Sequence, residues 1–154
     1  MVRSGSKTPG IKTKEFLTEV VELVRMQLPP ELQEVHVVGP MGSLVKLHYG
    51  DPKVHYEVWV RRRDLAVEAG LHFEGKPEAN ARYLTELTAR HAKAITSLGP
   101  EVSPEEWVGS WTRVHQEFSF TILDEDLLMV VSGRLAQIMT TLQPAVRKIA
   151  SSML

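Results

Sequence analysis

The sequence VHYEVWVRRRDLAVEAGLHFE, residues 54–74, decides the fold of this chain. Apolar and polar residues alternate in both halves of the stretch, and side chains two residues apart on a β-strand point to the same face of a sheet. Residues 54–61 and 65–73 are therefore expected to form two antiparallel strands joined at the run of arginines. The apolar face carries Val54, Tyr56, Val58, Val60, Leu65, Val67, Ala69, Leu71 and Phe73. The opposite face is polar and carries His55, Glu57, Trp59, Arg61, Glu68, Gly70, His72 and Glu74.

Further strands are expected at 35–38, 44–49 and 111–120. Because one strand face is apolar and the other polar, the sheet should carry helices on one side and meet water on the other. The sequence thus predicts an α+β fold, with a single antiparallel sheet of about five strands and three main helices on one face. The expected order of elements is α-β-β-β-β-α-β-α.

Helical spacing of apolar residues predicts the three main helices. They are expected from Thr13 to Leu28, from Pro77 to Gly99 and from Asp124 toward the C-terminal end. Pro144 should kink or restart the last of them. The residues Ser103-Pro104-Glu105-Glu106 match a capping box, which predicts a short helical turn that carries Trp107.

One domain is expected over residues 13–154, preceded by a flexible lead-in over residues 1–12. The chain has 154 residues, a formal net charge of -1 and no cysteine. The missing cysteines exclude a disulfide framework and a thiolate metal site, and the low net charge gives no overall attraction to nucleic acid. No apolar run is long enough to cross a membrane, and residues 1–14 lack the apolar core of a signal peptide. We therefore expect a cytoplasmic protein with no membrane partner.

A His-x-Glu triplet occurs three times on the predicted strands, at residues 55–57, 72–74 and 115–117. The two outer residues of each triplet share the polar face, and imidazole and carboxylate are ligands for zinc, nickel or manganese. A tight turn at the arginines would set His55 opposite Gly70, with His72 diagonally about 7 Å away. The alternative is an ordinary polar strand face on which these groups pair or meet water. The candidate metal ligands are His55, Glu57, His72 and Glu74.

Two further patterns bear on nucleic acid. Asp64 followed by Glu74-Gly75-Lys76 is similar to the acidic pairs and lysine with which restriction-type nucleases hold magnesium, but Asp64 and Glu74 share one predicted strand. The run Arg61, Arg62 and Arg63 at a hairpin tip would suit phosphate contacts, and it would equally suit an ordinary solvated tip.

Tryptophan on the polar face favours a recognition surface, because an indole ring exposed on an open sheet is typical of binding sites. Trp59 and Arg61 lie on this face of the third strand, and Trp111 and Arg113 are placed with them on the last strand. These four residues are the predicted partner-binding residues. The alternative is that a helix or the lead-in covers the rings.

The stretch 68–74, the helix over 84–99, the pair Glu106-Trp107 and the triplet 142–144 together resemble small bacterial domains of unknown function. Some of those domains are attached to restriction-type nucleases. The order of elements is also similar to that of type III secretion chaperones, which are dimers that bind unfolded effector segments. This chain departs from the chaperones in its longer middle helix and in lacking their marked acidity. The resemblance carries no functional residue over.

We expect a non-enzymatic protein-interaction domain that forms homodimers and has no catalytic residue. The alternative is a metal-dependent nucleic-acid-processing domain that would use the four candidate metal ligands and Lys76. A divalent metal is the only cofactor expected, and only if those ligands bind one.

Overall fold

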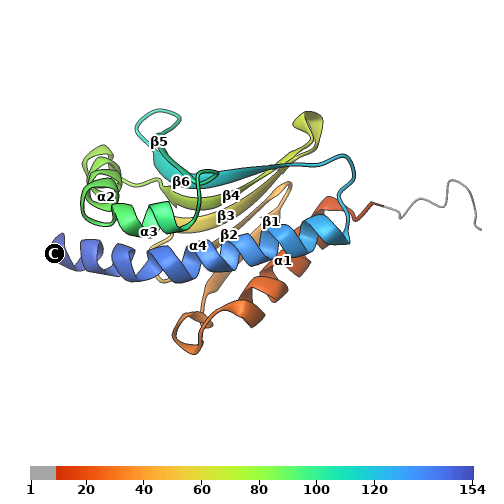
Figure 1. Cartoon of the computed structure of the whole chain (residues 1–154), viewed down its shortest axis with the longest axis horizontal. Coiled ribbons are helices and arrows are strands. Elements are labelled where there is room, and N and C mark those ends of the chain that lie inside the picture. The colour runs from red at the N-terminus through yellow and green to blue at the C-terminus, as the bar shows by residue number, and fades with distance from the viewer. Residues whose placement is uncertain (1–9) are drawn as a thin grey trace, which may run out of the picture.

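The separation of apolar and polar strand faces produces one layer of sheet on one layer of helices in the computed structural model, which describes residues 10–154 (Figure 1). Its helices are α1 (Thr13–Gln27), α2 (Pro77–Arg90), α3 (Ala92–Ser97) and α4 (Glu125–Ser152). Its strands are β1 (His36–Met41), β2 (Leu44–His48), β3 (Val54–Arg61), β4 (Ala66–Phe73), β5 (Ser103–Glu106) and β6 (Thr112–Ser119). Two short 3₁₀ turns span Pro30–Leu32 and Arg62–Asp64.

All six strands pair antiparallel in one sheet with the order β1-β2-β3-β4-β6-β5. The predicted fold class is therefore confirmed, with one strand more than the expected five. Because β3 and β4 occupy the centre of this sheet, their polar faces lie far from both edges. Any site that their side chains form is therefore held in place by strand pairing on both sides.

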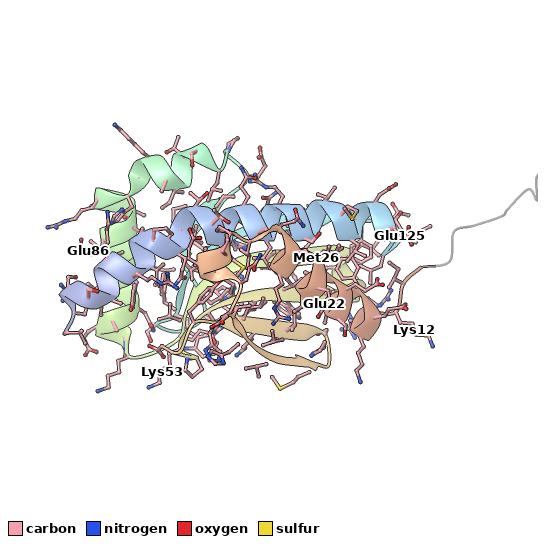
Figure 2. The ribbon with its side chains drawn as sticks, turned by 90° about the horizontal axis from the view of Figure 1, so that it is seen from below. Lys12, Glu22, Met26, Lys53, Glu86 and Glu125 are labelled. Carbon is pink, nitrogen blue, oxygen red and sulfur yellow. The ribbon has the colours of Figure 1, made fainter. Side chains whose placement is uncertain are left out.

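The core fills the space between the sheet and the helices. Leu71 and Phe73 of β4 are fully enclosed, and so are Phe16 of α1 and Leu135 of α4. Figure 2, seen from the helical side, shows α4 lying beside α1, with charged side chains such as Glu22 and Glu125 on the outside. The apolar stripes of both helices therefore face the sheet, as their spacing predicts.

The β3–β4 turn differs from the prediction. Arg61 lies opposite Ala66, so four residues form the turn where two were expected, and Leu65 closes it with a φ of 50°. This places His55 directly opposite His72 and Glu57 opposite Gly70. The pairing thus shifts by two residues, which leaves every side chain on its predicted face because the strand period is two. Leu65 itself leaves the apolar face and is 50% exposed.

The predicted helical turn at Ser103–Glu106 is wrong, because these residues form the edge strand β5. Ser103 lies opposite His115 and Glu106 opposite Thr112, so β5 supplies pairing partners that β6 would otherwise lack. The capping-box pattern depends on these four residues alone. Pairing with the edge of β6 gives the same residues a ladder of backbone hydrogen bonds, and this pairing determines their strand conformation. Pro104 is tolerated here because an edge strand has one side free of pairing.

Two predictions about the helices also need correction. The helix expected from Pro77 to Gly99 is divided at His91 into α2 and α3, which turns Ile95 and Leu98 toward the core. α4 continues through Pro144 without the restart that was one of the two expected outcomes there. Of the lead-in predicted over residues 1–12, residues 1–9 lie outside the described part of the chain. Within the described part, the Ile11 N–H donates a hydrogen bond to the Leu123 carbonyl at 2.6 Å. None of the helices in residues 10–154 combines the length and the apolar character that a membrane span requires.

Replacing Leu71 by Ala should lower the free energy of unfolding by about 2–5 kcal/mol, since it leaves a cavity in the centre of the core. Leu65→Ala is the matched control, because Leu65 is half exposed at the turn and should change stability by less than about 0.5 kcal/mol. Urea denaturation followed by circular dichroism measures both values. An equal effect of the two substitutions would contradict the assignment of the core.

Candidate metal centre

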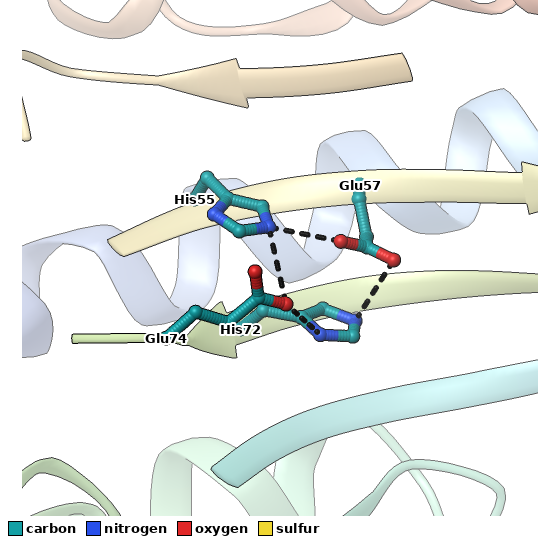
Figure 3. Close-up of side chains that lie close together, drawn as sticks. All are labelled: His55, Glu57, His72 and Glu74. Carbon is teal, nitrogen blue, oxygen red and sulfur yellow. Dashed lines mark hydrogen bonds and ion pairs between the residues drawn. The ribbon is translucent and has the colours of Figure 1, made fainter. Parts of the chain in front are cut away.

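Strands β3 and β4 bring all four predicted metal ligands together. His55 and Glu57 project from β3, His72 projects from β4, and Glu74 directly follows the end of β4 (Figure 3). One ligand atom from each residue lies within 4.8 Å of the others. His55 is 1% exposed, Glu57 5% and His72 2%, and the side chain of Glu74 is 10% exposed. The predicted set is thus one cluster, which we call the His-Glu cluster.

Both ring nitrogens of His55 face oxygen atoms that accept hydrogen bonds. Its Nδ1 lies 2.9 Å from the Pro52 carbonyl oxygen, and its Nε2 lies 2.8 Å from Oε1 of Glu57. A carbonyl oxygen only accepts, so Nδ1 carries a proton and donates. A neutral imidazole then presents a lone pair at Nε2 to a carboxylate that also accepts. The contact of 2.8 Å is therefore a hydrogen bond that needs a second proton, shared between Nε2 and the carboxylate.

His72 contacts both carboxylates at greater distances. Its Nδ1 lies 3.3 Å from Oε2 of Glu74, and its Nε2 lies 3.6 Å from Oε2 of Glu57. Nε2 of His55 is 3.7 Å from Oε2 of Glu74. Nδ1 of His72 has no hydrogen-bond partner among the described residues, although the side chain is buried. The ring is fixed by stacking on His55, with centroids 5.6 Å apart and planes 5° from parallel.

The His-Glu cluster has little built-in positive charge. Its one charged basic neighbour in the described chain is Lys46 of β2, whose Nζ lies 3.7 Å from Oε1 of Glu74. Burial tends to raise the pKa of Glu74, but the imidazoles of His72 and His55 and the ammonium of Lys46 outweigh it and lower this pKa. Glu74 is therefore ionised at neutral pH in a site that excludes most water.

A second buried network lies beside the first on the same face, centred on Glu68. Its Oε1 accepts from Arg113 at 2.7 Å, and its Oε2 accepts from Arg61 at 2.6 Å. Glu105 of β5 lies 2.7 Å from Arg113 and 2.9 Å from Nε2 of His115. Two guanidinium groups thus pair with the buried carboxylate of Glu68, so this network carries its own cations.

The hairpin between β5 and β6 covers the His-Glu cluster with an indole ring. The Trp107 ring centroid lies 5.1 Å from that of His72, and the Arg113 guanidinium lies 4.3 Å from the same indole centroid. Trp59 and Trp111 lie on either side of Trp107, with centroids at 6.5 Å and 6.1 Å. All three tryptophans of the chain therefore gather on this face.

The prediction that the polar face meets water is wrong at its centre. Every residue of β4 is buried, because the Trp107 hairpin covers the face and its charged groups pair with one another. Of the predicted partner-binding residues, Arg61 and Arg113 are held in ion pairs and Trp59 is half-buried, while Trp111 is 38% exposed. The segment beside Trp59 is the β5–β6 hairpin, whose Trp107 ring lies 6.5 Å away, and not the helix or the lead-in named in the alternative interpretation.

The residues of the nuclease-like pattern do not come together. Asp64 precedes β4 and pairs with Arg61 at 2.7 Å, whereas Glu74 and Lys76 follow the other end of that strand. Arg62 is also occupied, since it donates to Oγ1 of Thr13 at 2.7 Å. The third triplet splits as well, because His115 joins the Glu68 network and Glu117 is exposed.

Sequence reasoning missed three groups that shape the site. Lys46 stood on a predicted strand beside β3, so its position opposite Glu57 follows once β2 and β3 are paired. The Pro52 carbonyl belongs to the turn before β3, and nothing in the sequence marks a backbone acceptor. Trp107 was placed on a helix by the capping-box pattern. The signal that favours a hairpin instead is the spacing of two residues that separates Glu105 from Trp107 and, again, Trp111 from Arg113.

Comparisons with models of protein families, with curated proteins and with solved structures find no match for this chain. The resemblance to small bacterial domains and to secretion chaperones therefore stays a prediction, and the site is argued from its own geometry.

Stability in acid should depend on Glu68. The pKa of Glu68 is lowered from 4.5 to about 2, and the His115 imidazole contributes most, with its Nδ1 3.3 Å from Oε1 of Glu68. Burial of Glu68 opposes this shift, and the charges of Arg113 and Arg61 add to it. A carboxylate with a lowered pKa stabilises the folded chain fully above its unfolded value and loses this contribution as the pH falls from about 4.5 toward 2.

Glu68→Gln should therefore lower Tm most above pH 5 and progressively less toward pH 2. Thermal melts of both proteins between pH 2 and pH 7 measure the difference. Glu117→Gln, on the same strand face but exposed, is the control and should show little pH-dependent difference. A constant gap between wild type and Glu68→Gln across this range would refute the ion-pair account.

Proposed function

We propose that this chain is a metal-binding domain that holds one divalent first-row transition ion, zinc or a close neighbour, in the His-Glu cluster. The observation that carries the proposal is the convergence of two imidazoles and two carboxylates in one buried cluster, with one ligand atom from each within 4.8 Å of the others. The contact of 2.8 Å between Nε2 of His55 and Oε1 of Glu57 is a hydrogen bond within it. Nδ1 of His55 donates to a backbone carbonyl, which is the usual arrangement of a histidine that binds a metal through Nε2. Two imidazoles and two carboxylates form a donor set that such ions accept.

The other distances in the cluster favour a metal ion over a proton. A proton shared by two groups brings the heavy atoms to hydrogen-bond distance, about 2.7–3.2 Å. Separations of 3.3, 3.6 and 3.7 Å join His72 and His55 to the carboxylates. Two ligands of one tetrahedral ion with bonds of about 2.0–2.2 Å lie about 3.3–3.6 Å apart.

Charge balance supports the same conclusion. The Glu68 network contains two guanidinium groups that pair with the buried carboxylate of Glu68, whereas the His-Glu cluster has only Lys46 at its rim. Two imidazolium ions stacked at 5.6 Å would repel each other in a buried site. A divalent cation neutralises both carboxylates and leaves both imidazoles neutral.

Four protein ligands and a covering indole are typical of a structural metal site, because catalytic sites keep a coordination position open to water or substrate. We therefore propose a non-enzymatic role in which the ion joins β3 to β4. The nucleic-acid-processing alternative has less support, since Asp64 and Lys76 lie at opposite ends of β4. A cytoplasmic location belongs to the same proposal, supported by the absence of cysteine from the chain.

A second candidate function is protein interaction through a homodimer, favoured by the tip of the β5–β6 hairpin. Val108 is 63% exposed there and Trp111 38% exposed, next to the covered Trp107. Exposed aromatic and aliphatic side chains that lie together are typical of interface centres. The proposed interface is therefore this tip, in place of the surface of Trp59, Arg61, Trp111 and Arg113 expected from the sequence.

Zinc added to chelator-treated protein should bind at one ion per chain and raise Tm. An ion at 100 times its Kd stabilises the folded state by about 2.7 kcal/mol. His72→Gln should abolish both the bound mass and the rise in Tm, since it removes the imidazole that lies between the two carboxylates. Native mass spectrometry and thermal melts give the two readouts.

The matched control is His91→Gln, which lies between α2 and α3 and outside the cluster. It should bind zinc as the wild type does. Circular dichroism verifies that both variants are folded. If wild type takes up neither zinc, nickel nor manganese, the cluster is an ordinary buried ion-pair network and the proposal fails.

For the second candidate, light scattering after size-exclusion chromatography should give the mass of a dimer. Val108→Ser combined with Trp111→Ser should reduce it to the mass of one chain, because the substitutions remove the apolar contact at the tip. Met129→Ser, at an exposed apolar residue of α4, should leave the dimer intact. A wild-type chain that stays monomeric at high concentration rules this candidate out.

A further inference from the structure

Four of the six histidines form a continuous row across the polar face of the sheet. His36 of β1 lies opposite His48 of β2, His48 lies opposite His55 of β3, and His55 lies opposite His72 of β4. Residues that are directly opposed on neighbouring strands project from the same face with Cβ atoms about 4.5–5.5 Å apart. The row therefore joins the exposed edge of the sheet to the His-Glu cluster without interruption.

Exposure falls steadily along the row. His36 is exposed and His48 is partly buried, whereas His55 is 1% and His72 2% exposed. The rings of the outer pair stack with centroids 5.2 Å apart and planes 21° from parallel. The inner pair repeats this arrangement at 5.6 Å. Two similar imidazole pairs are thus arranged in series from solvent to the interior.

An ion needs a path to a buried site, and the surroundings of the His-Glu cluster leave few directions. The sheet closes it from below, and Trp107 lies against His72 on the side of β6. On the side of β2 the neighbours are Lys46 and His48, and both are partly exposed. The direction along the row is therefore the one lined with metal-binding side chains that reach solvent.

We infer that His36 and His48 form an outer metal site, which captures the divalent ion at the sheet edge and passes it to the His-Glu cluster. This inference rests on the proposed function of that cluster. The outer pair offers two imidazoles, whereas the inner cluster adds two carboxylates, so the ion is held more tightly inside.

The hydrogen bond of His48 also makes the outer site weak. Its Nδ1 accepts from the Gly50 N–H at 3.1 Å, so the proton of the neutral ring is on Nε2. Offering a lone pair to an ion requires that the Gly50 hydrogen bond break, because moving the proton from Nε2 to Nδ1 would also remove the acceptor of that bond. A ligand with this cost suits a transfer position, from which the ion must leave again.

The test is the rate of zinc exchange, followed by intrinsic fluorescence, because all three tryptophans lie on the face that holds the cluster. Stopped-flow mixing of chelator-treated protein with zinc gives the association rate, and mixing of loaded protein with excess EDTA gives the release rate. The comparison is between wild type, the double variant His36→Gln with His48→Gln, and His91→Gln as the matched control.

The double variant should lower both rates by the same factor, about threefold or more, because residues on a path change the barrier and leave the end states alone. Its zinc Kd should stay as in wild type, and His91→Gln should change none of the three quantities. Unchanged rates overturn the inference. A weaker Kd with an unchanged association rate overturns it too, since His36 and His48 would then act on the bound state.

The two proposals fail in different ways. If wild type binds zinc and only the exchange rates are insensitive to the double variant, the His-Glu cluster stands as the metal site and the access route is rejected. If wild type binds no ion, the proposed function fails and the outer site falls with it.

Discussion

The register of β3 against β4 is the constraint on which the polar side of this molecule depends. It sets His55 directly opposite His72, so that two imidazoles stack while Glu57 and Glu74 reach them from either side. A register shifted by two residues would keep every side chain on its face but would move His72 to a diagonal position, about 7 Å from His55. The turn of four residues that ends at Leu65, with its positive φ, therefore determines that the two imidazoles stack.

This explains which features the sequence could predict. Alternation in residues 54–74 assigns faces, because face depends only on odd and even spacing, and the candidate metal ligands were chosen by that rule alone. Register depends on the length of a turn, and Arg62 and Arg63 fit a two-residue turn as well as a longer one. β5 was missed because Ser103 to Glu106 satisfies a local capping pattern, whereas its strand conformation comes from pairing with β6, which lies several residues further along the chain.

The close approach of β4 and β6 separates the two buried networks. A Cβ on Gly70 would lie 2.4 Å from the Val114 carbonyl oxygen and 2.5 Å from Cα of His115, so only glycine permits the observed spacing. Gly70 also lies between Glu68 and His72, which belong to different networks. The absence of a side chain at this one position lets an arginine-balanced network and an imidazole-rich cluster lie side by side in one sheet.

The contrast between these neighbours is the strongest argument about what the protein does. Burying carboxylates costs several kcal/mol per ion unless cations and hydrogen bonds compensate. Around Glu68 the chain supplies that compensation with Arg61 and Arg113, so its burial needs nothing from outside. Around Glu57 and Glu74 the chain supplies imidazoles, which are lone-pair donors when neutral. Stability alone would be served as well by arginine or by apolar side chains at positions 55 and 72. The burial of two carboxylates among ligand nitrogens therefore supports the proposed cation site, and the row of histidines toward the sheet edge supports the proposed path to it.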